Sequence, residues 1–362
     1  MHPEFRSLLT RAARHGVALW VMMAVFFPSA RLAAKDAVEQ LQAFSLFSEV
    51  DLPKLIQGEV LTERGPLTDF RRGISGQSCY VVRRSPAAVA ERIQTAAPPV
   101  DNENVYFHAK IGSPVREADL AGLALNLRNS DVQRLVERTL KVTATSTDFC
   151  MSRGEATRME EVVREGKSAG SAPAVIAQRA WTDLLLGRLR EFQEKGISAV
   201  SPYDMEKNPV SPGEEMRRLM REEPEVQARF QGLLEEVGLF PSKTETRLKG
   251  AGYAELLNAQ IVATFDLGAV FVKPLSNGEI QVLDVQYFSS NAYYVMLTLY
   301  HLWPISTEGG EATLVWRGDF LSAYLLEATR GTPRMAWGLV MMREIKQSIQ
   351  SFQKSILSNS PR

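Results

Sequence analysis

IVATFDLGAVFVKPLSNGEIQVLDVQYFSSNAYYVMLTLYHLWPISTEGGEATLVWRGDFLSAY, residues 261–324, is the stretch that decides the fold of this chain. Apolar runs alternate in it with turn signals, the triplet Ser276-Asn277-Gly278 and the glycine pair at 309–310. Asn and Gly tolerate the positive φ angles that tight turns need. The pattern therefore predicts antiparallel strands over 261–272, 279–288, 291–303 and 313–324. The third strand is apolar on both faces, which predicts a central position in the sheet.

A long amphipathic helix is expected directly after these strands. Thr332-Pro333 opens it, and lysines and glutamine occupy its other faces. The apolar side chains that recur at helical spacing are Met335, Met342, Ile345, Ile349, Phe352 and Ile356. A helix with one apolar face needs an apolar surface to lie on, and the preceding sheet supplies one. The expected fold class is α+β, with an antiparallel sheet gripping the long C-terminal helix.

The chain before residue 261 is predicted to be more helical. A helical pattern spans 35–50, and residues 74–82, ISGQSCYVV, are typical of a strand. Ser85-Pro86 then supplies an N-cap and a proline at the first helical position of a short helix. A further strand is predicted at 105–111, and helices at 132–140, 171–195, 213–222 and 224–237. We expect one domain, 31–362, in which 112–258 is a mainly helical insertion or subdomain.

The composition of the chain bounds its partners. Of its 362 residues 42 are basic and 42 acidic, so the formal net charge is zero. A neutral chain without a basic stripe has no general attraction for nucleic acid, and no nucleic-acid partner is expected. The apolar content of 45% is that of an ordinary folded protein. The oligomeric state stays open.

The first thirty residues have the layout of a secretory signal peptide. Three arginines precede the apolar run GVALWVMMAVFF, residues 16–27, and small residues follow it. A helix needs about 20 apolar residues to cross a bilayer, and this run is shorter. We therefore expect 1–30 to be removed, with cleavage after Ala30 or Ala34. The mature chain would be a soluble, exported protein, periplasmic or extracellular, without a transmembrane segment.

Motifs for metal or nucleophilic chemistry are weak. After the signal segment the chain has only His108 and His301, and it has no H-E-x-x-H motif, so neither a metal nor a cofactor is expected. Residues 166–170, GKSAG, fit the G-x-S-x-G pattern of serine hydrolases. That motif needs an apolar strand before it, and the charged EEVVRE stands there instead. Residues 151–170 are polar and expected to be partly exposed, and the GKSAG segment is interpreted as a flexible linker before the helix that starts near Ser171.

Three carboxylates lie inside otherwise apolar strands: Asp266, Asp284 and Asp319. Burial of a carboxylate costs free energy unless the group is paired. Two alternatives stay open. The three side chains face solvent on the polar side of a half-exposed sheet, or two of them converge with Arg317 in a cavity, where they would orient a polar head group or do acid–base chemistry.

Aromatic side chains crowd the same strands, and core packing is expected to take most of them. A subset that lines a cavity would suit an apolar ligand with a polar tip. The candidate site residues are Asp266, Asp284, Tyr287, Tyr294, Tyr300, Trp316, Arg317 and, on the closing helix, Ile345.

Cys79 and Cys150 are the only cysteines of the chain. In an oxidising compartment the two can form one disulfide bond. The alternative is a pair of buried free thiols, because Cys packs well as a small apolar residue. The sequence leaves both alternatives open.

Two segments resemble the START-like (SRPBCC) helix-grip superfamily. CYVVRRSPAAVAERIQ, residues 79–94, is similar to the family's first strand and the proline-started helix after it. ATLVWRGDF, residues 312–320, followed by the helix at 332–357, is similar to its last strand and closing helix. The resemblance implies a curved sheet around a helix, with an apolar cavity for lipids, sterols, polyketides or other hydrophobic molecules.

The leading functional hypothesis is an exported protein that binds a lipid-like, apolar small molecule without catalysis. The first alternative is a periplasmic enzyme, a hydrolase or a cyclase-like protein, that uses the sheet carboxylates. The second is an envelope interaction or structural domain with a filled core. The presence of a cavity would distinguish the ligand-binding hypothesis from the structural domain with a filled core.

The signal-peptide hypothesis predicts where the mature chain begins. After export, its N-terminus is expected between Arg31 and Lys35, and the intact mass of the exported protein measures it. Full-length chain recovered from the membrane fraction would contradict the prediction.

Overall fold

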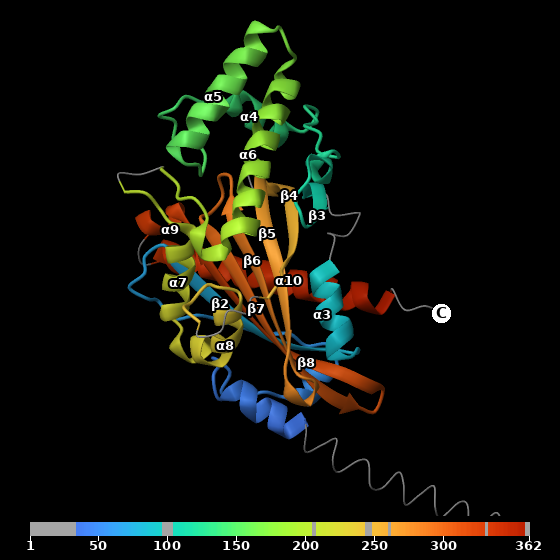
Figure 1. The fold of residues 1–362 in the computed structure, drawn as a ribbon. Helices are drawn as coiled ribbons and strands as arrows, with labels where there is room; N and C mark the ends of the chain where they lie inside the picture. The colour runs from blue at the N-terminus through green and yellow to red at the C-terminus, as the bar shows by residue number, and fades with distance from the viewer. Residues whose placement is uncertain are drawn as a thin grey trace, which may run out of the picture.

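One antiparallel sheet organises the protein. The computed structural model describes residues 34–95, 104–204, 208–242, 248–259, 262–329 and 332–358, so the predicted signal peptide, 1–30, lies outside the described residues. Within the described ranges the strands form an eight-stranded sheet in the order β1-β2-β8-β7-β6-β5-β4-β3, and every neighbouring pair is antiparallel (Figure 1). The protein is therefore of the α+β class, as predicted.

The four strands predicted for residues 261–324 are confirmed. Their bounds are β5 Val262–Pro274, β6 Ile280–Ser289, β7 Val295–Thr307 and β8 Gly310–Ser322. The β5–β6 turn contains the 3-10 segment η3, Ser276–Gly278, in which Asn277 has φ 62° and Gly278 φ 76°. β7 lies between β6 and β8. Its apolar composition on both faces follows from this position, because helices cover the sheet on both sides.

The other half of the sheet comes from strands far apart in the chain. They are β1 Leu61–Arg64, β2 Gly73–Val82, β3 Val105–Ile111 and β4 Ala251–Ala259. β4 pairs with both β3 and β5, so the predicted boundary of the insertion at residue 258 is wrong. The strand pattern AGYAELLNA is short and carries Glu and Asn, which hid it among the preceding helices. The mainly helical segment ends before residue 251.

Helices cover one face of the sheet. These are the helical residues 34–42 and, between β3 and β4, the helices α4 Ser130–Thr139, α5 Arg153–Ser168, α6 Pro173–Lys195, α7 Pro212–Arg221 and α8 Pro224–Glu236, with the 3-10 turns η1 Glu117–Leu120 and η2 Ile197–Ala199. Their aromatic side chains meet those of the strands. Trp181 of α6 lies 4.9 Å from Phe265, and Phe192 stacks on Tyr287 at 4.1 Å between ring centroids. The turn between α5 and α6 projects beyond the sheet (Figure 1).

The interpretation of residues 166–170 as a flexible linker is wrong for its first three residues, because α5 extends to Ser168. Ser152 caps the helix by accepting a hydrogen bond from the backbone N–H of Glu155, whose side chain accepts from the backbone N–H of Ser152 in return. Ala156, Met159, Val162 and Val163 form its buried stripe. Charged side chains fill the rest of the helix, so the segment is polar on average and its apolar stripe was overlooked in the sequence. The G-x-S-x-G serine stands at the end of this helix.

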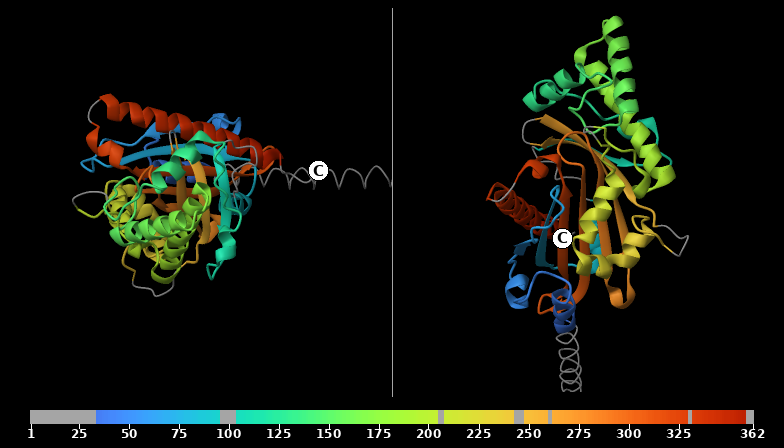
Figure 2. Two further views of the ribbon diagram at one scale, coloured as in Figure 1. Left: turned by 90° about the horizontal axis from the view of Figure 1, so that it is seen from above. Right: turned by 90° about the vertical axis from the view of Figure 1, so that its left-hand side faces the viewer.

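The opposite face of the sheet carries α3 Pro86–Thr95 and α10 Thr332–Ser358. Two short helices complete the fold, α2 Leu52–Ile56 before β1 and α9 Tyr324–Ala328 between β8 and α10. Figure 2 shows α10 across the sheet from α7 and α8. A cluster on this face joins Ile345 and Ile349 of α10 to Tyr80 of β2 and Tyr300 of β7. Gly76 of β2 permits the close approach, because a Cβ there would lie 2.3 Å from the Met342 methyl group.

The predicted apolar stripe of α10 is correct in its middle and wrong at its start. Met342, Ile345, Ile349 and Ile356 are buried, and Phe352 is half-buried. Met335 is 48% exposed, whereas its neighbour Arg334 is buried and donates to Gly73 O at the start of β2. Within the described residues, no helix has both the length and the apolar character that a bilayer crossing requires.

The two cysteines are separate, buried free thiols in the structure, which is the second of the two alternatives that the sequence left open. Cys79 lies on β2, in the core cluster beneath the helices. Cys150 lies before α5, where its backbone N–H donates to Ser290 O at 2.7 Å and its Sγ contacts Tyr293 O at 3.7 Å. Burial raises the pKa of both thiols, that of Cys150 to about 12, so each packs as a small apolar group.

The packing of α10 predicts the effect of shortening its buried side chains. Ile349 is 1% exposed, and Ile349→Ala is expected to lower the free energy of unfolding by about 2–5 kcal/mol through lost burial and a residual cavity. Leu339→Ala, on the same helix at 67% exposure, is the control and is expected to change it by less than about 0.5 kcal/mol. Urea unfolding measures both. Equal effects would mean that α10 does not cover the sheet.

Candidate functional site

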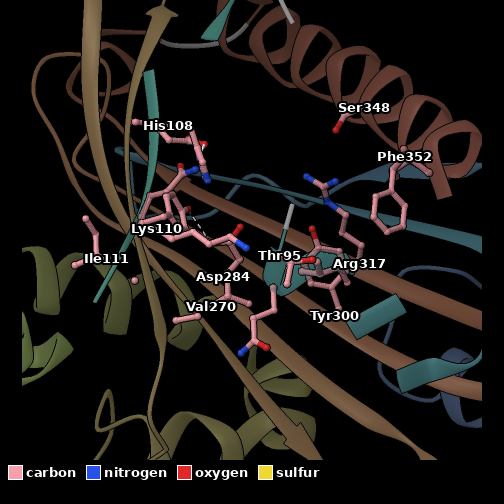
Figure 3. Close-up of a pocket in the computed structure, with 18 of the residues that line it drawn as sticks. Thr95, His108, Lys110, Ile111, Val270, Asp284, Tyr300, Arg317, Ser348 and Phe352 are labelled. Carbon is pink, nitrogen blue, oxygen red and sulfur yellow. Dashed lines mark hydrogen bonds and ion pairs between the residues drawn. The ribbon is translucent and has the colours of Figure 1, made fainter. Parts of the chain in front are cut away.

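A cavity of about 400 Å³ lies on the sheet face that α3 and α10 cover (Figure 3). Apolar side chains from α3, β3, β5 and α10 line part of it: Ile93, Ile111, Val270, Ile349 and Phe352. Polar and charged side chains from four strands line the rest: His108, Lys110, Glu255, Asp284, Gln286 and Arg317. The cavity thus joins an apolar wall to a polar floor.

The polar floor follows from the two-residue period of the strands. Along β6, Asp284 and Gln286 face the cavity, while Val285 and Tyr287 between and beside them belong to the core under the helices. β3 and β4 bring their polar residues to the same floor, because His108 and Glu255 are directly opposed in the register. Strand alternation and register together concentrate these groups on one face.

Asp284 lies at the centre of the floor. Its Oδ1 accepts a hydrogen bond from Tyr253 Oη at 2.8 Å. Tyr253 crosses Gly268 to reach it, and a Cβ at Gly268 would lie 2.2 Å from the Tyr253 ring. The pKa of Asp284 is raised to about 6, because burial disfavours the charged form more than the Tyr253 hydrogen bond favours it. The group therefore titrates near neutral pH.

Arg317 is held in the floor by Asp319. Its Nε donates to Asp319 Oδ2 at 2.8 Å and its Nη2 to Oδ1 at 2.7 Å, a bidentate pair. Thr298 Oγ1 also donates to Asp319 Oδ1, at 3.0 Å. The guanidinium stands 5.6 Å from the centre of the Tyr300 ring. The ion pair is buried and satisfied, so it orders this part of the floor and neutralises its own charge.

His108 and Glu255 form a second pair at the β3–β4 end. His108 Nδ1 and Glu255 Oε1 are 2.8 Å apart. Among the described residues, none makes a hydrogen bond to the buried Nε2 of His108. Because Nδ1 is oriented by the carboxylate, the imidazole presents Nε2 in a defined direction. A ligand or water at this end of the cavity would meet that nitrogen.

Asp266 is deeper on the same face of the sheet, opposite Glu255 in the register. It is 2% exposed, and its Oδ2 accepts from Tyr293 Oη at 2.6 Å. Tyr293 Oη is also 2.6 Å from Gln286 Oε1. Burial raises the pKa of Asp266 to about 7 despite the hydrogen bonds to its carboxylate. Asp266 thus supports the floor through Tyr293 and Gln286 without lining the cavity.

The structure brings only some of the predicted site residues together. Asp284, Tyr300 and Arg317 line the cavity, Asp266 lies behind it, and Ile345 packs one turn before the lining residue Ile349. Tyr287 and Trp316 do not reach the cavity, because strand alternation directs them to the opposite face, and Tyr294, just before β7, lies in the same core cluster as these two. The rings of Tyr287, Tyr294 and Trp316 pack against Phe192, Tyr203 and Phe230 respectively.

The hypothesis that the three aspartates face solvent on an open sheet is wrong. Asp266 and Asp319 are buried, at 2% and 0% exposure, and Asp284 lines the cavity. The hypothesis assumed one uncovered face, whereas α3 and α10 cover the face that carries them. The second alternative, convergence in a cavity with Arg317, fits Asp284.

Several residues of the floor escaped the sequence analysis: His108, Lys110, Tyr253, Glu255 and Gln286. VYFHAKI alternates polar and apolar residues, so His108 and Lys110 share one face of the predicted strand. That alternation was the available signal. The alternation alone could not place these residues in a site, because β4, the strand that pairs with β3, is far away in the chain and was taken for part of the helical segment.

The described part of the chain holds no cluster of His, Cys, Asp and Glu side chains suited to a metal ion. Comparisons with protein-family models, with curated proteins and with solved structures found no significant match. The fold and the cavity therefore define this protein: an α+β protein whose sheet is covered by helices on both faces, with an amphipathic cavity on one face.

Asp266 predicts a pH dependence of stability. A carboxyl whose pKa is raised in the folded state stabilises the fold below its unfolded pKa, and this contribution is lost as the pH rises through the folded value, about 7. Between pH 4 and 8 the loss is expected to be roughly 2–4 kcal/mol. Asp266→Asn keeps a neutral group there, and its free energy of unfolding is expected to fall less over this interval.

Urea unfolding at pH 4 and pH 8 measures the difference. Asp36→Asn, at an exposed position, is the control and should retain the wild-type dependence. The same pH dependence in wild type and Asp266→Asn would show that Asp266 is not buried as described.

Proposed function

We propose that this chain is an exported binding protein that holds an apolar small molecule with a polar head group, without changing it chemically. One observation carries the proposal, the cavity of about 400 Å³ with an apolar wall and a polar floor. Ligand sites in proteins are commonly concave, largely apolar, and oriented by a few convergent polar groups. The size is in the range for a small molecule, which favours a bound ligand over a filled structural core.

The proposed placement of the ligand's apolar part is against α10 and α3. Ile349 and Phe352 approach from α10 and Ile93 from α3, while Val270 of β5 completes the apolar wall. The head group would lie toward Asp284 and Arg317. This orientation buries the apolar part and leaves the polar head beside groups that form hydrogen bonds, so neither part is mismatched with its surroundings.

We further propose that the sheet grips α10 in the manner of the START-like helix-grip proteins. The order β2, α3, later antiparallel strands and a closing helix supports this, as does the apolar cluster shared by α10 and β2. The segment between β3 and β4 would then be an elaboration on the other face. Export to the periplasm or the extracellular space belongs to the same proposal and is supported by the pattern of residues 1–30.

A general acid–base enzyme in the same cavity is the second candidate function. Asp284 titrates near pH 6, which suits a group that exchanges a proton at neutral pH, and His108 presents an unpartnered Nε2. A hydrolase or cyclase-like activity would need Asp284 and His108 to act on the same ligand. Recovery of a chemically changed ligand that depends on Asp284 would favour this candidate, and recovery of the unchanged ligand the first.

The binding proposal predicts that a bulky side chain at the cavity mouth blocks binding. Ser348 is exposed and lines the cavity from α10 (Figure 3), so Ser348→Trp should be tolerated by the fold and occupy the cavity. We expect at least a tenfold weaker affinity for the neutral fluorescent probe N-phenyl-1-naphthylamine. Mass spectrometry of organic extracts should likewise recover less co-purified ligand.

Ser351→Trp is the matched control, an exposed serine on the same helix that does not line the cavity. It should bind the probe as the wild type does. Saturable binding that is unaffected by Ser348→Trp would locate the probe elsewhere, and the absence of any binding would contradict the proposed function.

A further inference from the structure

Asp284 differs from the other charged groups of the cavity floor because no cationic side chain of the described residues is paired with it. Arg317 gives its Nε and Nη2 to Asp319, and His108 is paired with Glu255. Asp284 has only the neutral Tyr253 hydroxyl, on Oδ1, and no hydrogen bond from the described residues reaches its Oδ2. The carboxylate therefore lines the cavity without a cation of its own.

The charged surroundings of Asp284 are themselves more negative than positive. The nearby carboxylates Glu255 and Asp319 raise its pKa, and the Arg317 guanidinium lowers it. α3 and α10 add only uncharged polar groups to the lining, Gln94, Thr95 and Ser348. Lys110 also lines the cavity, from β3, three strands from β6, and it is not among the groups that shift the pKa of Asp284.

Aromatic rings surround the same position. Tyr253 donates a hydrogen bond to Asp284, and Tyr300 lies on the neighbouring strand β7, two residues from Thr298, which is opposite Asp284. Phe352 lines the cavity from α10. Aromatic faces attract cations, and the Arg317 guanidinium already lies over the Tyr300 ring. A buried carboxylate beside several rings is the chemistry that recognises an organic ammonium group.

We propose that the cavity selects amphipathic molecules that carry a protonated amine, with the amine paired to Asp284 beside the rings of Tyr253 and Tyr300. This inference rests on the proposed function and names its ligand class. The ammonium group would donate to the open Oδ2 while Tyr253 stays on Oδ1. The apolar tail would extend toward Ile349 and Phe352. A carboxylate head would instead meet Asp284 and Glu255, which repel it.

Competition between ligands that differ only in the head group tests this inference. Decylamine, 1-decanol and decanoate, each below its micelle concentration, compete with N-phenyl-1-naphthylamine for the mature protein at pH 8. Decylamine is expected to compete about tenfold more strongly than decanol, the factor that one desolvated ion pair or cation–π contact can supply. At pH 5 Asp284 is protonated while the amine stays charged, so this ratio should fall toward one.

Asp284→Asn should abolish the preference for decylamine over decanol. Glu344→Gln, an equal change of charge at an exposed site on α10 outside the cavity, should keep the preference. The ratio and its pH trend in the wild type test the inference even without the variant.

The outcomes separate the inference from the proposed function. Equal competition by the three ligands, or strongest competition by decanoate, would overturn the amine inference and leave ligand binding intact. A preference for decylamine that persists in Asp284→Asn would also overturn it. If neither the probe nor any of the three ligands binds, the proposed function fails and the inference fails with it.

Discussion

The burial of both faces of one antiparallel sheet is the constraint on which this structure depends. β7 carries apolar side chains on both sides, so a single layer of helices would leave half of them in water. The chain supplies two different covers. The helices between β3 and β4, with the helical residues 34–42, take one face, and α3 with α10 takes the other. Without the sheet, the apolar faces of both helical covers would be exposed to water.

The two covers differ in how completely they fill the space above the strands. On the first face, aromatic rings of helices and strands interlock: Phe44 and Phe230 meet Trp316, and Trp181 meets Phe265. On the second face, α10 contacts β1 and β2 while α3 contacts the strands from β5 to β8. The interval between these helices is where the cavity lies. A sheet covered by two separate helices leaves such an interval, whereas a continuous helical layer does not.

Polar residues are tolerated on the second face because they find partners on the same strand or on a neighbouring segment. Asp319 holds Arg317, Glu255 holds His108, and Tyr293 donates to Asp266. Burial without these partners would cost several kcal/mol for each group. Asp284 differs from the others because its partner is a neutral hydroxyl. The same interactions that make the face foldable therefore leave one carboxylate open to a ligand.

The sequence by itself determined the local elements and the α+β class. The period of apolar residues and the turn at Asn277-Gly278 depend only on neighbouring residues, so the strands from β5 to β8, α3, α6 and α10 could be predicted from the chain alone. Among the candidate site residues, Asp284, Tyr300 and Arg317 were found because a polar group in an apolar strand is conspicuous. Only the tertiary structure decided which face each residue occupies. A sheet covered on both sides has no polar face, so alternation separates Tyr287 from Gln286 without telling which of the two lines a cavity. His108 and Glu255 meet because β3 pairs with β4 across the intervening helical segment, and a contact between residues 147 positions apart leaves no periodic trace in the sequence.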